Sequence, residues 1–342
     1  MGISVNPHKM GHFWSIGLII FVLTVVLLTV KQFFWHGRQK QIRNKHVVVT
    51  GGSSGIGKCV AIDAARRGAH VTIIARDLKK LEAAKHEILQ ACKHKDVQKV
   101  ECVSLDIGSN YENVEKTFNN IERTIGPIYM LINCAGTAIC GKIEDTTIDN
   151  LKHMVNLNFM GTYYCIKAVI SRMKSANEGI IVLTSSQAGL LGIFGFSAYG
   201  STKFAIRGLA ESLAMEVAPH NISVTLSLPP DTDTPGFSIE EQNKPLETKL
   251  ISAGSGLFTP EVVAEQLMKD SLSGKFFSTV GLDGFILVTL CAGMSPFSSI
   301  CELLLQSLLA GILRLVGACY LVSFQKIILD CMKNRDKNKK SE

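Results

Sequence analysis

Several features that would point to other classes of protein are missing from this 342-residue sequence. It has no CxxC pair, and its ten cysteines stand singly, many of them inside apolar stretches. Because zinc sites and disulfide frameworks both need cysteines at regular spacings, we expect neither, and the thiols fit a reducing compartment. The formal net charge is +7, but no nucleic-acid-binding module or aromatic-interleaved basic surface occurs. We therefore expect no metal site and no nucleic-acid partner.

What is present is apolar sequence near both ends, and hydrophobic residues make up 46% of the chain. An uncharged apolar run covers residues 13–30, and Phe33, Phe34 and Trp35 follow it. With these aromatic residues as an interfacial belt, the run is long enough to span a bilayer. A cleaved signal peptide would have a shorter apolar core, followed by small residues. We expect an uncleaved anchor, and the basic residues after it indicate that the next domain faces the cytoplasm.

A second apolar region covers residues 285–324 and leads into a basic tail. Its later part, residues 303–324, is long enough to span a bilayer but contains Arg314. One span, a tight hairpin, an amphipathic helix lying on the membrane and a buried helix of the soluble domain are all compatible with this pattern. Lys339 and Lys340, close to the chain end, resemble the dilysine retrieval signal of endoplasmic-reticulum membrane proteins. We therefore expect the membrane of the endoplasmic reticulum.

Between these ends the chain begins a βαβ unit with a glycine-rich first turn. Residues 45–50 read as a buried strand, residues 58–67 as a helix and residues 70–75 as a second strand. The glycines allow a tight turn, close approach of a pyrophosphate and close helix packing, while the amides at the helix start bind the anion. A hydrolase nucleophile elbow matches the same residues, but no His–acid pair has an evident place beside it. The candidate cofactor contacts in the turn are Gly51, Ser53, Ser54, Gly55, Ile56 and Gly57.

The residue at the tip of the second strand indicates which cofactor binds. NAD enzymes usually have an acid there, which holds the ribose 2′-hydroxyl, whereas this chain has Arg76, which suits the 2′-phosphate of NADP. Lys80 lies one helical turn further on and could reach the same phosphate, although it could equally be a solvated helix-face lysine. Asp77, beside Arg76, is the feature that favours NAD. We expect NADPH.

Polar residues in the middle of the chain are weaker candidates for the site. Asp106 ends a third strand pattern and could contact the adenine amine, or it could simply cap the strand. Asn133 ends a fourth strand pattern, and the small residues after it can lie flat against a cofactor. Asn158 belongs to a long helix pattern over residues 148–174, where an asparagine by itself is unremarkable.

A tyrosine and a lysine four residues apart form the strongest chemical signal. A strand pattern ends at Ser185 and Ser186, and Tyr199 follows Ser186 by thirteen residues, with Lys203 on the same helical face as Tyr199. The ammonium, with a bound nicotinamide, can lower the phenol pKa from its usual value of about 10. A serine hydroxyl can bind a carbonyl and stabilise a developing oxyanion. Because neighbouring strand residues point in opposite directions, register decides which serine does so, and we prefer Ser186.

Together these motifs resemble the short-chain dehydrogenase/reductase family over about residues 45–235. The resemblance implies a Rossmann-type, doubly wound parallel α/β sheet and a tetrad of Asn158, Ser186, Tyr199 and Lys203. In that tetrad Tyr199 donates the proton during reduction, Lys203 binds the nicotinamide ribose, and Asn158 holds a water that relays protons.

One segment departs from the family pattern. Where the family usually has Pro-Gly after the sixth strand, this chain has Pro229 and Pro230, which are stiffer. The backbone of Thr232 and the hydroxyl of Thr234 remain candidates for cofactor contact.

Further segments resemble family members that reduce a long-chain sphingoid ketone, namely residues 185–189, 192–196, 229–237 and 244–248. The resemblance implies NADPH-dependent reduction of 3-ketodihydrosphingosine to dihydrosphingosine at the cytosolic face of the endoplasmic reticulum. A membrane-bound family member acting on a steroid or retinoid, and a catalytically silent NADP-binding scaffold, are the alternatives. An apolar mouth for the lipid could be lined by Phe194, Phe196, Phe237, Leu257 and Phe258.

The expected organisation has three parts. Residues 1–44 form the membrane anchor and a basic linker, residues 45–275 the NADP-binding catalytic domain, and residues 276–342 an apolar membrane-associated region with a basic tail. The expected partners are a lipid ketone and the bilayer. The sequence leaves open whether the protein forms a homo-oligomer.

Overall fold

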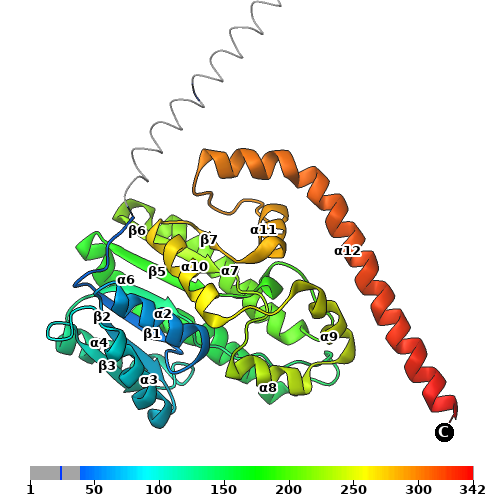
Figure 1. The fold of residues 1–342 in the computed structure, drawn as a ribbon, viewed down its shortest axis with the longest axis horizontal. Coiled ribbons are helices and arrows are strands. Elements are labelled where there is room, and N and C mark those ends of the chain that lie inside the picture. Colours follow the sequence, from blue (N-terminus) through cyan, green and yellow to red (C-terminus); the bar gives the residue numbers. More distant parts are fainter. Residues whose placement is uncertain (1–23, 25–38, 342) are drawn as a thin grey trace, which may run out of the picture.

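A computed structural model describes Thr24 and residues 39–341, and these contain a seven-stranded parallel sheet (Figure 1). The strand order is β3-β2-β1-β4-β5-β6-β7. This confirms the predicted Rossmann-type sheet, and the order reverses between β1 and β4, where such sheets form a ligand crevice at the carboxyl ends of the strands. The strands are β1 His46–Thr50, β2 His70–Ala75, β3 Val100–Ser104, β4 Ile128–Asn133, β5 Gly179–Thr184, β6 Ile222–Ser227 and β7 Phe277–Ser278.

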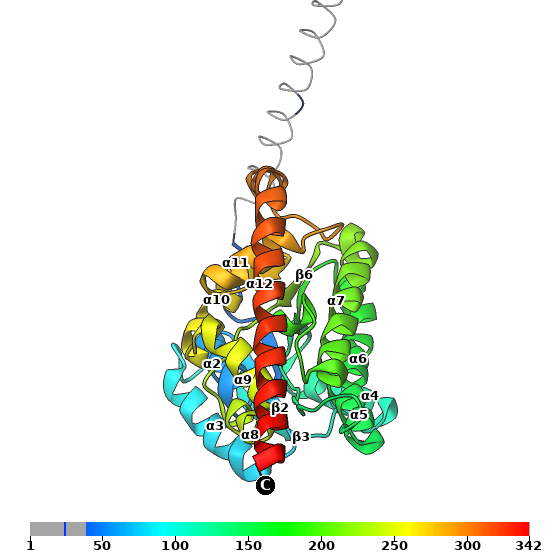
Figure 2. The ribbon, with the colours of Figure 1, turned by 90° about the vertical axis from the view of Figure 1, so that its right-hand side faces the viewer.

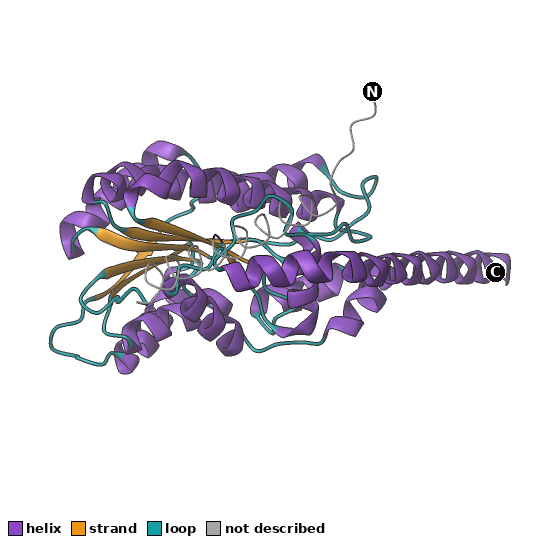
Figure 3. Ribbon diagram, turned by 90° about the horizontal axis from the view of Figure 1, so that it is seen from above, coloured by secondary structure: helices purple, strands orange, loops and turns teal. Residues whose placement is uncertain are grey.

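Helices cover both faces of the sheet, as Figure 3 shows from above. In β1, Val47 and Val49 pack into one core cluster and Val48 into the other, and all three are fully buried. This double burial explains why the strands read as continuous apolar runs. The helices are α2 Gly55–Arg66, α3 Leu78–Ala91, α4 Tyr111–Ile125, α5 Ile148–Met154, α6 Gly161–Ala176, α7 Ser197–Val217, α8 Pro235–Asn243, α9 Leu246–Ser252, α10 Pro260–Leu272, α11 Gly281–Leu290 and α12 Ile300–Ser341.

The predicted continuous helix over residues 148–174 is interrupted. A wider π-helical turn, Val155–Met160, separates α5 from α6 and contains Asn158. At the start of α6, a Cβ on Gly161 would lie 2.8 Å from Ile107 Cγ1, so the helix packs closely against the segment after β3. Such single π turns are often found at functional sites, and the apolar pattern alone does not reveal the extra residue that they accommodate.

The C-terminal apolar region forms the short α11 and the long α12. Figures 1 and 2 show α12 running along one side of the molecule, past α11 and α9. Within the described part of the chain, Ile300–Lys337 is the one helix that is long and apolar enough to cross a membrane, and its most apolar stretch is not buried. A buried helix of the soluble domain is therefore wrong for residues 303–324, which lie within the single helix α12. The predicted anchor at residues 13–30 lies, apart from Thr24, outside the described residues.

Candidate active site

The glycine-rich turn lies where β1 meets α2. Gly51 and Gly55 have φ of 69° and 53°, in the left-handed region that favours glycine. A Cβ on Gly51 would lie 2.8 Å from Ala135 N, and one on Gly57 would lie 2.4 Å from Gly51 O, so a side chain at either place would clash with backbone. Ser54, at the N-cap of α2, makes no capping hydrogen bond with its side chain. The first amides of α2 therefore remain available for an anion.

A groove of about 340 Å³ extends from this turn along the carboxyl ends of the strands. Its lining includes Cys134, Ala135 and Gly136, the small residues after β4. The free amides and the close backbone approach at the glycines fit the predicted dinucleotide. The sequence-predicted residues that line the groove are Gly51, Ser53, Ser54, Gly55, Ile56, Gly57, Arg76, Lys80, Asp106 and Thr234.

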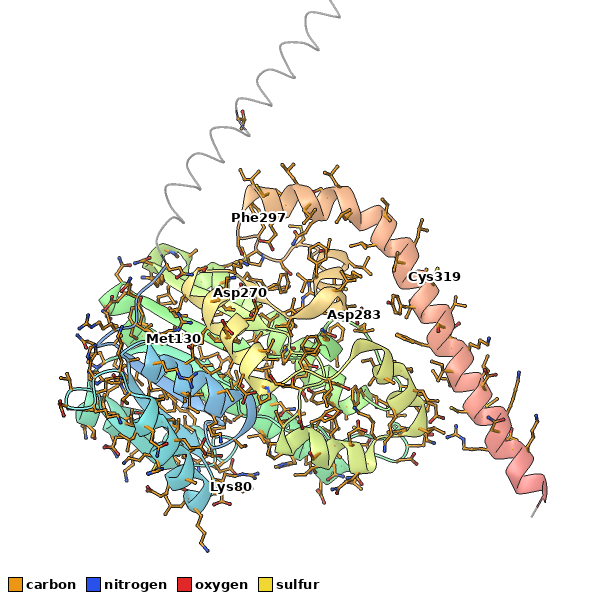
Figure 4. The ribbon with its side chains drawn as sticks, in the orientation of Figure 1. Lys80, Met130, Asp270, Asp283, Phe297 and Cys319 are labelled. Carbon is orange, nitrogen blue, oxygen red and sulfur yellow. The ribbon has the colours of Figure 1, made fainter. Side chains whose placement is uncertain are left out.

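Arg76 and Asp77 have different roles at the end of β2. The Asp77 carboxylate accepts a hydrogen bond of 3.1 Å from Lys80 N and caps α3. Because the Asp77 carboxylate caps α3, its presence next to Arg76 does not contradict NADP as the cofactor of this groove. Arg76 is exposed at the groove, whereas Figure 4 shows the Lys80 side chain extending outward from α3. Asp106 accepts a hydrogen bond of 3.0 Å from Gly108 N while it lines the groove.

Two of the predicted cofactor contacts that do not line the groove, Asn133 and Thr232, use their side chains elsewhere. Asn133 is buried, and its Nδ2 donates to Val182 O at 3.1 Å, so the side chain ties β4 to β5. The Thr232 hydroxyl donates to Pro230 O at 2.8 Å, and its backbone pairs with Phe258. Their side chains are therefore engaged within the protein. The predicted cofactor contact concerns the Thr232 backbone and stays a prediction, because the hydrogen bonds with Phe258 are made by its neighbours Asp231 and Asp233. Thr234 does line the groove, where its hydroxyl also caps α8 by accepting from Phe237 N.

Asn158 and Lys203 meet beside the inner end of the groove. A Cβ on Gly136 would lie 3.2 Å from Asn158 Oδ1 and 3.5 Å from Lys203 Nζ, so the glycine leaves room for both. The Lys203 ammonium is 5.7 Å from the centre of the Tyr199 ring and donates to Thr184 O at 3.1 Å. The π turn and α7 thus bring three of the four predicted tetrad residues to one place, namely Asn158, Tyr199 and Lys203.

Two threonines that belong to none of the sequence motifs hold Asn158 there. Asn158 Nδ2 donates to Thr137 O at 2.9 Å and to Thr202 Oγ1 at 3.0 Å, and its Oδ1 accepts from Thr137 N at 2.9 Å. Thr202 in turn donates to Tyr199 O at 2.8 Å. The position of Thr202 between Tyr199 and Lys203 is the one signal in the sequence that could have indicated this contact.

The two serines after β5 point in different directions. Ser185 is buried and donates to Lys203 O at 2.8 Å, so it supports α7 and is not available to a substrate. Ser186 lines a second cavity and shares a hydrogen bond with the Tyr199 phenol. Of the two predicted serines, only Ser186 is therefore placed to contact a carbonyl, and Ser185 is not supported as a substrate contact.

The surroundings of Tyr199 shift the pKa of its phenol. Burial raises the pKa of Tyr199, the carboxylates of Glu240 and Asp231 raise it further, and the hydrogen bond with Ser186 opposes them only in part. Burial also lowers the pKa of Lys203 to about 8. Burial therefore dominates in the protein itself, and the expected lowering of the phenol pKa by Lys203 with a bound nicotinamide stays a prediction. The surroundings keep the phenol protonated, as a proton donor requires.

The second cavity, of about 480 Å³, begins at Ser186 and is mostly apolar. Phe196 lines it, whereas Phe194, Phe237, Leu257 and Phe258 do not, so most of the predicted mouth is wrong. In their place α11 and α12 supply the far wall of the cavity. The residues of this wall lie far from Ser186 in the sequence. Those wall residues include Ile286, Leu287, Leu290, Gly317, Tyr320, Leu321 and Phe324.

The chain is similar to known proteins over most of its length. The sequence profile of the family described as short chain dehydrogenase matches residues 45–244. A 3-dehydrosphinganine reductase of Danio rerio is 47% identical over 302 residues, which cover 88% of this chain and 91% of the relative. A 3-ketodihydrosphingosine reductase of Bos taurus is 48% identical over 294 residues, covering 85% and 88%.

Solved structures show the same fold. A short-chain dehydrogenase from Sphingobium yanoikuyae in complex with NADPH has a TM-score of 0.61 at 25% identity, covering 70% of this chain and 88% of its own. The structure of ElxO with NADP bound has a TM-score of 0.59 at 29% identity, covering 67% and 91%. The family profile, the relatives and the geometry of the crevice agree, and this chain belongs to the short-chain dehydrogenase family.

Proposed function

We propose that this protein reduces 3-ketodihydrosphingosine to dihydrosphingosine with NADPH. The observation that carries the proposal is the apolar cavity of about 480 Å³ that runs from Ser186 to the wall formed by α11 and α12. A long-chain ketone with its carbonyl at Ser186 would extend its chain along that wall, where burial of apolar surface stabilises binding. The relatives named as reductases of this ketone support the same substrate.

NADPH is the cofactor that the groove would hold. The amides at the start of α2 would bind the pyrophosphate, and Arg76 would pair with the 2′-phosphate, because a guanidinium matches phosphate geometry. The structural neighbours that bind NADPH or NADP support this choice. When bound, the reduced nicotinamide supplies the hydride for the ketone carbon.

The residues of this chain would manage the ketone oxygen and its proton. Ser186 would donate a hydrogen bond to the carbonyl oxygen and stabilise the negative charge that develops there. Tyr199, protonated in its buried setting, would transfer its phenolic proton to that oxygen. The Lys203 ammonium would stabilise the phenolate that results, and Asn158 would hold a water that relays protons.

The membrane setting is also part of the proposal. The apolar, unburied α12 supports membrane association, and an anchor at residues 13–30 would add a second attachment. The basic residues after that run and the tail lysines support the endoplasmic-reticulum membrane with the catalytic domain in the cytosol. A ketone that resides in the bilayer suits an enzyme held at its surface.

The test is NADPH oxidation by the purified full-length protein in detergent micelles. We expect turnover of 3-ketodihydrosphingosine and a far lower kcat/KM for a steroid ketone and a retinal. Replacement Tyr199→Phe should reduce kcat at least about 100-fold, because it removes the general acid, while NADPH binding is kept. Preference for the steroid or the retinal would contradict the substrate, and wild-type kcat in Tyr199→Phe would contradict the mechanism.

A further inference from the structure

The substrate of the proposed function has a chemical feature that the apolar cavity alone does not explain. 3-Ketodihydrosphingosine bears an amine on the carbon next to its ketone, and that amine is largely protonated near neutral pH. If the ketone oxygen binds at Ser186 and Tyr199, the ammonium must lie within a few ångströms of them. A site that accepts this substrate therefore needs a negative group close to Ser186, since a buried unpaired charge is costly.

The charged residues that line the cavity come from different elements. They are Asp231, Asp283 and Arg314. Asp283 lies on α11, as Figure 4 shows, and Arg314 on α12, so both belong to the far wall. Asp231 lies at the Ser186 end, because the loop that leads to it is joined to the Ser186 segment by a hydrogen bond from Gln187 N to Pro229 O of 3.2 Å.

The pairing of Asp231 leaves its charge incompletely neutralised. The fully buried Lys244 ammonium is 2.6 Å from Glu241 Oε1, 3.1 Å from Glu240 Oε1 and 3.4 Å from Asp231 Oδ2. One ammonium is thus shared by three carboxylates, and the longest of the three contacts is to Asp231. The excess negative charge extends to the catalytic centre, because Glu240 and Asp231 both favour the protonated form of Tyr199.

We propose that Asp231 binds the ammonium group next to the ketone and makes the enzyme selective for α-amino ketones. The inference rests on the proposed function, and it assigns to the loop after Pro230 a role in substrate choice. Asp231 lines the cavity, and its carboxylate contacts Lys244. An incoming ammonium would reduce the excess negative charge of the cluster, and it would lie at the Ser186 end of the cavity.

The test compares two ketones of equal chain length, 3-ketodihydrosphingosine and its analogue without the amine, in NADPH oxidation. Loss of a charged hydrogen bond of about 1.5–3 kcal/mol predicts that Asp231→Asn lowers the kcat/KM ratio of amino ketone to plain ketone by about 10- to 100-fold. Asp283→Asn is the matched control, because it removes the other cavity carboxylate, and it should keep the wild-type ratio. An equal loss on both ketones, or an unchanged ratio in Asp231→Asn, would overturn the proposal.

A binding measurement separates this inference from the proposed function. Wild-type protein saturated with NADP should bind dihydrosphingosine more tightly than N-acetyl-dihydrosphingosine, and Asp231→Asn should lose that preference while Asp231→Glu keeps most of it. Failure to turn over the amino ketone would remove the proposed function. Equal binding of the free amine and the neutral amide by the wild type would remove the role of Asp231 instead.

Discussion

Lys203 is a buried base whose charge depends on pH within the working range of an enzyme. Its ammonium lies under Gly136 at the inner end of the groove, and burial lowers its pKa to about 8. Below that pH the side chain is charged and can stabilise the developing Tyr199 phenolate. Above it the side chain loses its proton, and the same position holds a neutral amine.

A pH profile of reduction tests this behaviour. We expect kcat/KM for the ketone to be level below pH about 8 and to fall above it, since kcat/KM reports groups of the free enzyme. Replacement Lys203→Arg, whose side chain stays charged, should lower the rate through misfit but remove the fall. An unchanged fall in Lys203→Arg would assign the titration to another group.

In the proposed function, Arg76 selects NADPH over NADH. The neighbouring Asp77 is occupied in capping α3, so the guanidinium is the charged group at the ribose end of the groove. Replacement Arg76→Gln should weaken NADPH binding by about 10- to 100-fold, which corresponds to a charged hydrogen bond of about 1.5–3 kcal/mol, and leave NADH binding almost unchanged. Titration of both cofactors measures it. Lys80→Gln is the control, and a larger effect there would reverse the assignment.

At the scale of elements, an ion pair attaches α12 to the catalytic domain. Glu247 of α9 is fully buried, and its Oε1 pairs with Arg335 near the end of α12, while its Oε2 has no hydrogen-bond partner. The same helix contributes Tyr320 and Phe324 to the cavity wall. The ion pair thus holds the wall in place from a point several helical turns away.

Loss of this ion pair should loosen α12. Replacement Arg335→Gln leaves the Glu247 carboxylate buried and unpaired, which costs about 1–3 kcal/mol. We expect a lower melting temperature and faster proteolysis of α12. Adding Glu247→Gln to that variant should restore much of the stability, because a neutral amide is cheaper to bury. If the double variant is no more stable than Arg335→Gln, the ion pair does not stabilise the attachment of α12 to the catalytic domain.

On the scale of the whole molecule, the cavity and the apolar helix lie on the same side. The far wall of the cavity comes from α11 and α12, and the outer surface of α12 exposes large apolar side chains such as Leu308, Ile312 and Leu315. Exposed apolar surface of this extent is typical of a membrane contact. A lipid ketone could therefore pass from the bilayer to Ser186 along one helix.

Truncations separate the two proposed membrane attachments. Removal of residues 300–342 should reduce binding to liposomes and raise the KM for a long-chain ketone, because it removes both membrane surface and cavity wall. Removal of residues 1–38 should reduce liposome binding but keep the KM. Cosedimentation and NADPH oxidation measure the two effects. A normal KM without α12 would mean that the helix does not form the substrate wall.

Local patterns in the sequence determined the elements and most of the cofactor groove. The β-branched run before Gly51, the glycine spacing and the tyrosine–lysine pair each lie within a few turns or one strand, so neighbouring residues suffice to predict them. The strand observed at β2 has the predicted bounds, and the glycine turn lines the groove as expected. These parts depend on backbone geometry that the local sequence sets.

Only the tertiary structure decided where individual side chains point. It directed Ser186 toward the cavity and Ser185 toward α7, turned Asn133 and Thr232 away from the groove, and opened a π turn at Asn158. It also brought α11 and α12 to a site whose serine precedes them by about a hundred residues or more. Strand register and long-range packing control these features, and neither is encoded in a short stretch of chain.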